Sequence, residues 1–262
     1  MSIITNKSSI YLVSPDSKYD VMDPWPSFME ENFTIYLKAK ILVDELDQNV
    51  EGFMIARNGK HAGLSTYRDD QDNVHVAFNY WFWKPNPIEE SDGSITYGDP
   101  TPVQRKIVHT LVSQNRDLSN EYLAICNHAT RKMFFYVNNE LIGEIDYEGL
   151  DKECYTKAYM WIGCGSMLTP NREHANIGAY EYDLLFCLNK SLSLEEVNDL
   201  KDNYRESYMD NYFGFPILNS KTPHKENLFF FANFEQQTEY KVWNLCFNGC
   251  YIGFYIENNT VF

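Results

Sequence analysis

Apolar and polar residues alternate along much of the chain, which is the pattern of half-buried β-strands. The segment "NFTIYLKAKILV" (residues 32–43) begins with apolar residues at every second position. "EGFMIARNG" predicts a strand that ends in an Asn58-Gly59 turn, a strong hairpin signal. Residues 63–83 and 121–145 predict further strands with short polar turns between them. This spacing of turns favours an antiparallel sandwich or barrel.

One helix interrupts the strands. "LSLEEVNDLKDNYRE" predicts a helix over about 193–206, with Ser193 as N-cap and Glu196 completing a capping box. Two segments lack a strand pattern and are expected to be loops. They are "KPNPIEESDGSITYGDPTP" (84–102), which suits a rim loop, and the connector at 215–227.

The amino-acid composition limits the classes of molecule that the chain is expected to bind. Aromatic residues make up 16% of the 262 positions, and the formal net charge is −15. Such an acidic chain is unsuited to nucleic acid or to an anionic membrane surface. No apolar run approaches the 18 residues that a membrane-spanning helix needs, so we expect no membrane insertion. A glycan or glycosylated surface, and other protein subunits, remain as expected partners.

The cysteines and the N-terminus bear on localisation. The six cysteines lack the spacing of zinc ligands or of a disulfide framework, and several lie in apolar strand-like runs. Reduced, buried thiols are therefore expected. "MSIITNKSSIYLV" has no basic segment followed by a long apolar one, so we expect no signal peptide. These features indicate folding in a reducing cytoplasm, which is compatible with later incorporation into a virion.

The order of several segments resembles a known family. "FFYVNNELIGEI" resembles the hairpin of laminin-G-like, concanavalin A-like jelly rolls, and "ENFTIYLKAKI" resembles an early strand of that family. "IGCGS…ANIGAYEYDLLFCLNKSLSLEEVNDLKDNY" resembles its closing strands and short helix. The resemblance covers roughly residues 10–206. It implies an all-β, two-sheet antiparallel jelly-roll sandwich, and binding of carbohydrate or protein more often than catalysis.

The tail bears on domain organisation. "NLFFFANFE…KVWNLCFNGCYIG" resembles the first strand and turn of the same family, although Asn244 stands where Asp is common and Cys246-Phe247 replace Ser-Gly. We expect a single jelly-roll domain over 1–262, with 227–262 supplying closing strands, because so short a tail cannot bury its own core. The alternative is a jelly roll over 1–212 with a C-terminal extension.

A run of carboxylates raises the question of catalysis. Glu144-Ile145-Asp146-Tyr147-Glu148 matches the Glu-Ile-Asp-x-Glu string of laminarinase-type glycoside hydrolases in the same superfamily. A retaining glycosidase needs two carboxyl groups about 5–5.5 Å apart. Residues four apart on a flat strand are separated by roughly 13 Å. The string also follows a turn at 138–139 directly, and it lacks the upstream Trp of these enzymes. We therefore favour a solvated hairpin arm and no enzyme, with Glu144, Asp146 and Glu148 as the minority catalytic set.

Alternation points to a different candidate site. In "VHVAFNYWFW" (74–83), Val74, Val76, Phe78, Tyr80 and Phe82 are expected to face the core. If the neighbouring strands share one sheet, its outer face carries aromatic and polar side chains suited to pyranose rings. The predicted carbohydrate-binding residues are His75, Asn79, Trp81, Trp83, Tyr122, Tyr136 and Trp161. Coverage of this face by a loop, by the tail or by another subunit remains the competing interpretation.

No cofactor is expected. "YRDDQDN" offers Asp69, Asp70 and Asp72 as calcium ligands, since calcium takes several oxygen ligands. The segment has no Gly at the bend, so a solvated acidic turn is favoured and calcium stays the alternative. The sequence thus predicts a non-catalytic, lectin-like recognition or adhesion module. The alternatives are a structural or assembly protein, such as a virion or phage component, and thirdly the glycoside hydrolase.

Overall fold

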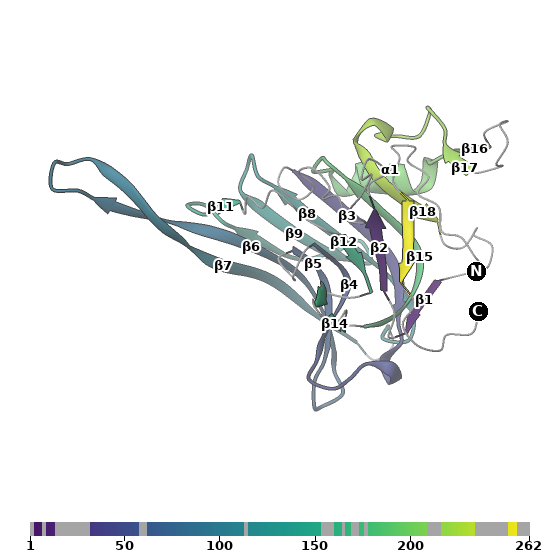
Figure 1. The fold of residues 1–262 in the computed structure, drawn as a ribbon. Helices are drawn as coiled ribbons and strands as arrows, with labels where there is room; N and C mark the ends of the chain where they lie inside the picture. The colour runs from purple at the N-terminus through teal and green to yellow at the C-terminus, as the bar shows by residue number, and fades with distance from the viewer. Residues whose placement is uncertain are drawn as a thin grey trace.

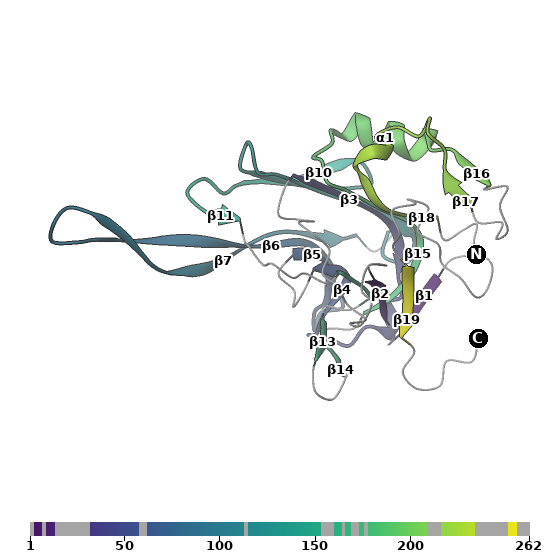
Figure 2. The ribbon, with the colours of Figure 1, turned by 45° about the horizontal axis from the view of Figure 1, so that its top comes forward.

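The computed structural model describes most of the chain as β-structure. It covers residues 3–6, 9–13, 32–57, 62–112, 115–152, 160–163, 166–168, 173–175, 178–208, 216–233 and 251–255. Two antiparallel sheets face each other, and within the described residues one α-helix accompanies them (Figures 1 and 2). The predicted all-β, two-sheet antiparallel jelly-roll sandwich with one short helix is confirmed.

Sheet A has the strand order β1-β15-β3-β8-β9-β10, and β18 also pairs with β15. All of these pairs are antiparallel. The strands are β1 (Ile3–Asn6), β3 (Phe33–Ile41), β8 (Ser119–Asn127), β9 (Lys132–Val137), β10 (Glu140–Asp146), β15 (Ala179–Leu188) and β18 (Leu228–Asn233).

Sheet B has the order β11-β6-β5-β4-β12-β2-β19, and β7 also pairs with β6. The strands are β2 (Ser9–Val13), β4 (Glu51–Arg57), β5 (Ala62–Arg68), β6 (Val74–Glu89), β7 (Ile95–Leu111), β11 (Asp151–Lys152), β12 (Met160–Ile162) and β19 (Tyr251–Tyr255). Minor elements are the strand pairs β13 (Ser166–Leu168) with β14 (Glu173–Ala175) and β16 (Glu206–Tyr208) with β17 (Pro216–Leu218), and the 3-10 helices η1 (Val43–Glu45) and η2 (Lys225–Asn227).

The main hydrophobic core lies between the two sheets. Alternate residues of β3 and β6 supply much of it, as the sequence pattern predicts. The buried set includes Phe33, Ile35, Leu37, Val74, Val76, Phe78, Tyr80 and Phe82. Cys126 and Cys187 are buried free thiols, and burial raises the pKa of Cys126 to about 12, as expected for an inert thiol. The other four cysteines lie outside the described residues.

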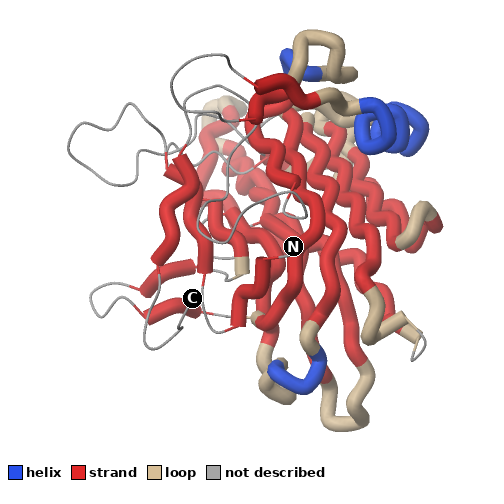
Figure 3. Tube along the Cα trace, turned by 90° about the vertical axis from the view of Figure 1, so that its right-hand side faces the viewer, coloured by secondary structure: helices blue, strands red, loops and turns tan. Residues whose placement is uncertain are grey.

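A second cluster covers the outer face of sheet A. The helix α1 (Leu194–Asn203) begins at the predicted N-cap, where the hydroxyl of Ser193 accepts from the backbone of Glu196 and the carboxylate of Glu196 accepts in return. Its buried residues Val197 and Leu200 pack with Phe231 of β18 and with outward residues of β8. Figures 2 and 3 show α1 lying on this side of the sandwich. Both faces of sheet A are therefore apolar.

The segment 84–102 is not a rim loop, so that prediction is wrong. β6 and β7 stay paired as far as Glu89 and Ile95, and they form a two-stranded arm, here residues 84–101, that projects from the body (Figure 1). The segment contains Pro85, Pro87, Pro100 and Pro102. Prolines are tolerated in edge strands where their missing N–H would face outward, or at bulges. Pro85 and Pro100 lie at the register shift between Lys84 and Asn86, and pairing continues on either side of it.

Strands from the tail join both sheets. β18 pairs with β15 in sheet A, and β19 pairs with β2 in sheet B. The Asn138-Asn139 turn between β9 and β10 has positive φ at both residues (50° and 67°), as a tight hairpin requires. None of the helices in the described ranges has the length and apolar character needed to cross a bilayer.

Candidate functional site

The predicted aromatic face does not lie on one sheet. Trp81 and Trp83 are in β6 of sheet B, whereas Tyr122 and Tyr136 are in β8 and β9 of sheet A. Trp161 belongs to β12 of sheet B, and its side chain lies outside the described residues. The prediction that these side chains share one face is therefore wrong.

Tyr122 faces the opposite way from its prediction. It is fully buried between the sheets, and burial raises its pKa. Alternation in residues 121–128 predicts that Leu123 and Ile125 face the core between the sheets, but both lie in the cluster beneath α1. Tyr136 is partly buried against that same cluster. Both faces of sheet A are apolar. Alternation in "EYLAICNH" therefore shows which residues share a face, but it does not show which of the two faces lies between the sheets. Sheet A offers no open aromatic platform at these residues.

The outer face of sheet B keeps the predicted orientation. Along β6, the residues between the core positions point away from the interior, and each has a cross-strand neighbour in β7. The pairs are His75 with Thr110, Asn79 with Lys106, Trp81 with Gln104, and Trp83 with Pro102. Side chains opposite each other on one face lie within contact distance. The β7 residues therefore belong to any site built on β6.

A chain of hydrogen bonds crosses this face through four strands. Lys106 Nζ and Ser65 Oγ both donate to Oε1 of Glu51, each at 2.8 Å. Asn79 Nδ2 donates to Ser65 Oγ at 2.6 Å, and Gln104 Nε2 donates to Asn79 Oδ1 at 3.5 Å. Ser65 and Asn79 are fully buried, whereas Gln104 and Lys106 are exposed. Asn79 therefore positions Gln104 and has no surface of its own to offer a ligand.

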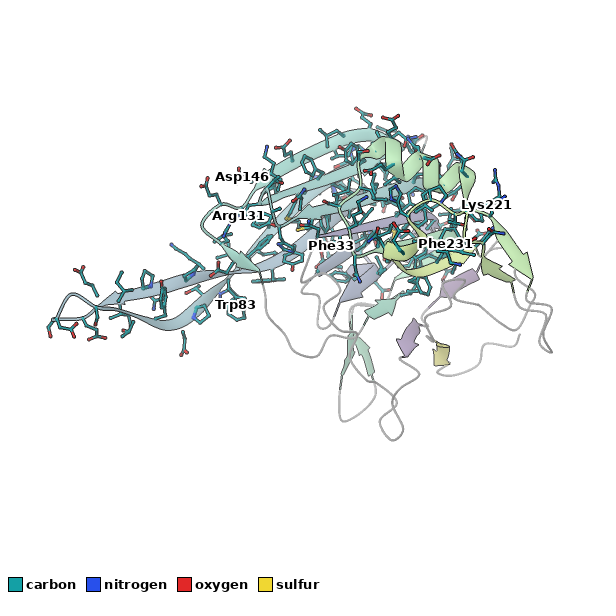
Figure 4. All side chains as sticks on the ribbon, turned by 90° about the horizontal axis from the view of Figure 1, so that it is seen from above. Phe33, Trp83, Arg131, Asp146, Lys221 and Phe231 are labelled. Carbon is teal, nitrogen blue, oxygen red and sulfur yellow. The ribbon has the colours of Figure 1, made fainter. Side chains whose placement is uncertain are left out.

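The chain of hydrogen bonds leads to a strip of exposed and partly exposed side chains at the base of the arm, here called the Trp81 strip. It consists of Trp81, Trp83, Pro102 and Gln104. Figure 4 shows Trp83 where the arm leaves the sheet. An indole offers an apolar face and an amide offers both a donor and an acceptor. The Trp81 strip thus combines a stacking surface with hydrogen-bonding groups.

His75 contacts the acidic turn between β5 and β6 through a hydrogen bond to Asp69. Its Nε2 lies 3.1 Å from Asp69 Oδ2, and its Nδ1 lies 2.8 Å from the hydroxyl of Thr110. The side chains of Asn73 and His75, together with backbone N–H groups, lower the pKa of Asp69 to about 2. Both ring nitrogens of His75 are therefore engaged by the protein itself.

The acidic turn does not have the form of a calcium site. The carboxylate of Asp69 accepts from Gln71, Asn73 and His75. Asp72 accepts from Arg68 at 2.8 Å, which lowers the pKa of Asp72. Asp70 is exposed beside them. Within the described part of the chain, no group of three or more His, Cys, Asp or Glu side chains converges as metal ligands do. The residues present do not fit calcium, because protein donors bind both oxygens of Asp69 and Oδ1 of Asp72.

The carboxylate run lies at an edge of sheet A. Glu144 forms an ion pair with Lys132 of the neighbouring strand and raises the pKa of that lysine. Asp146 lies at the exposed end of β10 (Figure 4), and its side chain accepts from the backbone N–H of Glu148 at 2.8 Å. Glu148 follows the strand in a turn. This is the arrangement of a solvated hairpin arm, in which the side chain of Asp146 stabilises the turn that follows the strand.

Sequence reasoning missed several residues of the outer face. Glu51, Ser65, Gln104 and Lys106 come from β4, β5 and β7, which are consecutive with β6 along the chain. Only the register of β4 on β5, and of β5 and β7 on β6, shows that these side chains form one chain of hydrogen bonds with Asn79. Gln104 also follows directly on the segment that the pattern assigned to a loop, so no alternation was visible there.

Comparison with solved structures found several proteins to which the chain is similar. The chain is similar to a heptameric pentraxin from Limulus polyphemus, with 9% identity, coverage of 95% of this chain and 96% of that one, and a TM-score of 0.46. It is similar to the CBM40 of a Ruminococcus gnavus sialidase bound to α2,3 sialyllactose, with 12% identity, 74% and 92% coverage, and a TM-score of 0.45.

The chain is also similar to a laminin structure, of which it covers less than half. Domains LG4-5 of the mouse laminin α1 chain are 12% identical, with 72% and 41% coverage and a TM-score of 0.39. Laminin G-like domains are thus among the structures that the chain is similar to, as the sequence resemblance predicted. No protein-family model matches the chain, and the comparison with curated proteins found no match. These likenesses concern the fold.

Proposed function

We propose that the chain is a non-catalytic, lectin-like module that binds a glycan at the Trp81 strip on the outer face of sheet B. The observation that carries the proposal is the hydrogen-bonded chain from Lys106 to Gln104. At its end, the exposed amide of Gln104 lies opposite Trp81 and donates to buried Asn79 over 3.5 Å. Ordering a long side chain before the ligand arrives reduces the entropy cost of binding.

The Trp81 strip suits a pyranose ring for a chemical reason. One face of such a ring carries C–H groups that stack on an indole, and its edge carries hydroxyl groups that pair with an amide. Trp81 and Gln104 supply both from neighbouring strands. The carboxylates at the edge of sheet A supply no such combination. Glu144 is paired with Lys132, and Asp146 accepts from the backbone N–H of Glu148. Binding without catalysis is the function that this geometry supports.

The proposal is tested on a glycan array with the wild-type chain, Trp81→Ala and Gln104→Ala. We expect binding by the wild type and its loss in Trp81→Ala. Gln104→Ala should weaken binding about tenfold, which corresponds to one hydrogen bond of ~1.4 kcal/mol. The matched control is Tyr136→Ala, an aromatic truncation on the opposite sheet, which should bind as the wild type does. Binding that survives Trp81→Ala would contradict this site.

The arm favours a second function, assembly with another protein subunit, for example in a virion or phage particle. Ile95 and Tyr97 near its tip are 61% and 72% exposed, which is unusual for large apolar side chains. Mass measurement in solution, with and without Ile95→Ser and Tyr97→Ser, tests this function in its homo-oligomeric form. A monomeric wild type would count against that form.

A further inference from the structure

The basic side chains of the glycan-binding face are held by carboxylates. In the described part of β4 to β7, two basic side chains face outward, Lys106 and His75. Lys106 Nζ lies 2.8 Å from Glu51 Oε1, and the two side chains are only 35% and 28% exposed. Since Glu51 also accepts from Ser65, it is fixed from two sides and holds the ammonium group against the sheet.

His75 is neutralised in the same way. Its Nε2 lies 3.1 Å from a carboxylate oxygen of Asp69, and that carboxyl stays ionised far into the acid range because its pKa is about 2. The pair therefore carries no net positive charge in either state of the imidazole. This end of the face does not attract anions.

The remaining basic residues of β6 and β7 point elsewhere. Arg105 is opposite Tyr80 and His109 is opposite Val76, and both partners face the interior. Lys84 follows Phe82 at the same alternation, opposite Thr101. Strand neighbours on one face repeat every second residue, so these three side chains lie on the other side of the ribbon from Trp81.

We infer that the glycan bound at the Trp81 strip is neutral, so that sialic acid, uronic acid and sulfate groups are excluded from the bound residues. This inference rests on the proposed function. Proteins recognise anionic groups with charge-assisted donors, most often a bidentate arginine. Here Lys106 would have to leave Glu51, and a partly buried carboxylate without its partner is costly. The net charge of −15 adds long-range repulsion.

The test is an array that carries neutral oligosaccharides beside the same oligosaccharides capped with sialic acid or sulfate. We expect the wild-type chain to bind neutral members and to bind their capped forms at least about tenfold more weakly, since like charges at an interface are strongly unfavourable. If capped glycans bind as well as neutral ones, and Trp81→Ala abolishes that binding, the inference is overturned and the proposed function stands. Binding to neither series would overturn the proposed function, and the inference with it.

A charge variant sharpens the same experiment. Glu51→Gln releases Lys106 and removes one negative charge, so the discrimination against capped glycans should shrink several-fold. Glu144→Gln makes the same change of charge at the edge of sheet A and should leave the discrimination unchanged. An equal effect of both variants would show that net charge alone sets the preference, which would contradict the role of the Lys106–Glu51 pair.

Discussion

The hydroxyl groups of Thr66 and Tyr180 lie 2.6 Å apart in the interior of the sandwich. Thr66 belongs to β5 of sheet B and Tyr180 to β15 of sheet A, and both are buried. A second bond of this kind runs from the hydroxyl of Tyr182 to the carbonyl of Met54 at 2.8 Å. Polar bonds therefore join the two sheets across an otherwise apolar core.

The bond between the sheets makes a stability prediction. Tyr180→Phe keeps the ring but leaves the hydroxyl of Thr66 buried without this partner, which costs about 1–3 kcal/mol. Urea unfolding followed by tryptophan fluorescence should show a lower midpoint with an unchanged slope. Tyr97→Phe, an identical change on the exposed arm, should leave the midpoint where it is. Equal midpoints for Tyr180→Phe and the wild type would contradict the role of the bond.

Asn79 links stability to binding. Asn79→Ala removes a buried side chain that joins Ser65 to Gln104. The unfolding free energy should fall by about 1–3 kcal/mol. Glycan affinity should fall about twofold to tenfold, because Gln104 must then be ordered by the ligand. Titration calorimetry on a glycan found on the array measures the second effect.

A destabilising control separates the two effects of Asn79→Ala. Val137→Ala truncates a buried residue of β9 in the opposite sheet and lowers stability by loss of packing. Its glycan affinity should equal that of the wild type. If Asn79→Ala also retains full affinity, the buried amide does not position Gln104 for a ligand.

Acid stability should depend on Asp69. The folded-state pKa of Asp69, about 2, is below the ordinary value of 3.8. A lowered folded pKa stabilises the folded state above the ordinary pKa, and this stabilisation is lost as the pH falls from about 4 to about 2. Asp69→Asn cannot titrate, so its stability should vary less with pH in this window. Thermal melts at pH steps between 2 and 5 measure the difference, and parallel curves for the two proteins would rule the contribution out.

The tail provides a test of domain organisation. β18 contributes Phe230, Phe231 and Ala232 to the two hydrophobic clusters, and all three are fully buried. A chain ending at Tyr212 should therefore leave one edge of β15 unpaired, open both clusters to water and lose its cooperative thermal transition. A truncated chain that melts cooperatively near the wild-type temperature would support the alternative, a jelly roll over 1–212 with an extension.

Local pattern predicted those parts of the fold in which one face is apolar and the other polar. The inward residues of β6, from Val74 to Phe82, and the cap of α1 at Ser193 follow from such signals. Tyr122 was placed on the wrong side because β8 is apolar on both faces, so only the packing of α1 and sheet B distinguishes them. The chain from Lys106 to Gln104 depends on the register between four consecutive strands, β4 to β7, which alternation within each strand does not encode.

The arm was missed for a different physical reason. Proline, glycine and acidic residues in 84–102 are typical of loops, yet pairing between β6 and β7 continues through them. The turn is closed by the backbone bond from Glu90 to Ser94 at 2.8 Å. The loop preference of these residues is outweighed because they continue two strands that are already paired in the body of the sheet.

The same arm and the sandwich should differ in how many substitutions they tolerate. Most residues between 84 and 101 are exposed on both strands. Gly93 in the turn is the exception to this tolerance, because its φ of 79° favours glycine. The other residues near the tip can therefore be exchanged, or the turn lengthened, without disturbing the packing of the sandwich. Whatever contacts the tip makes can change quickly between lineages, whereas the sheets beneath must keep their register.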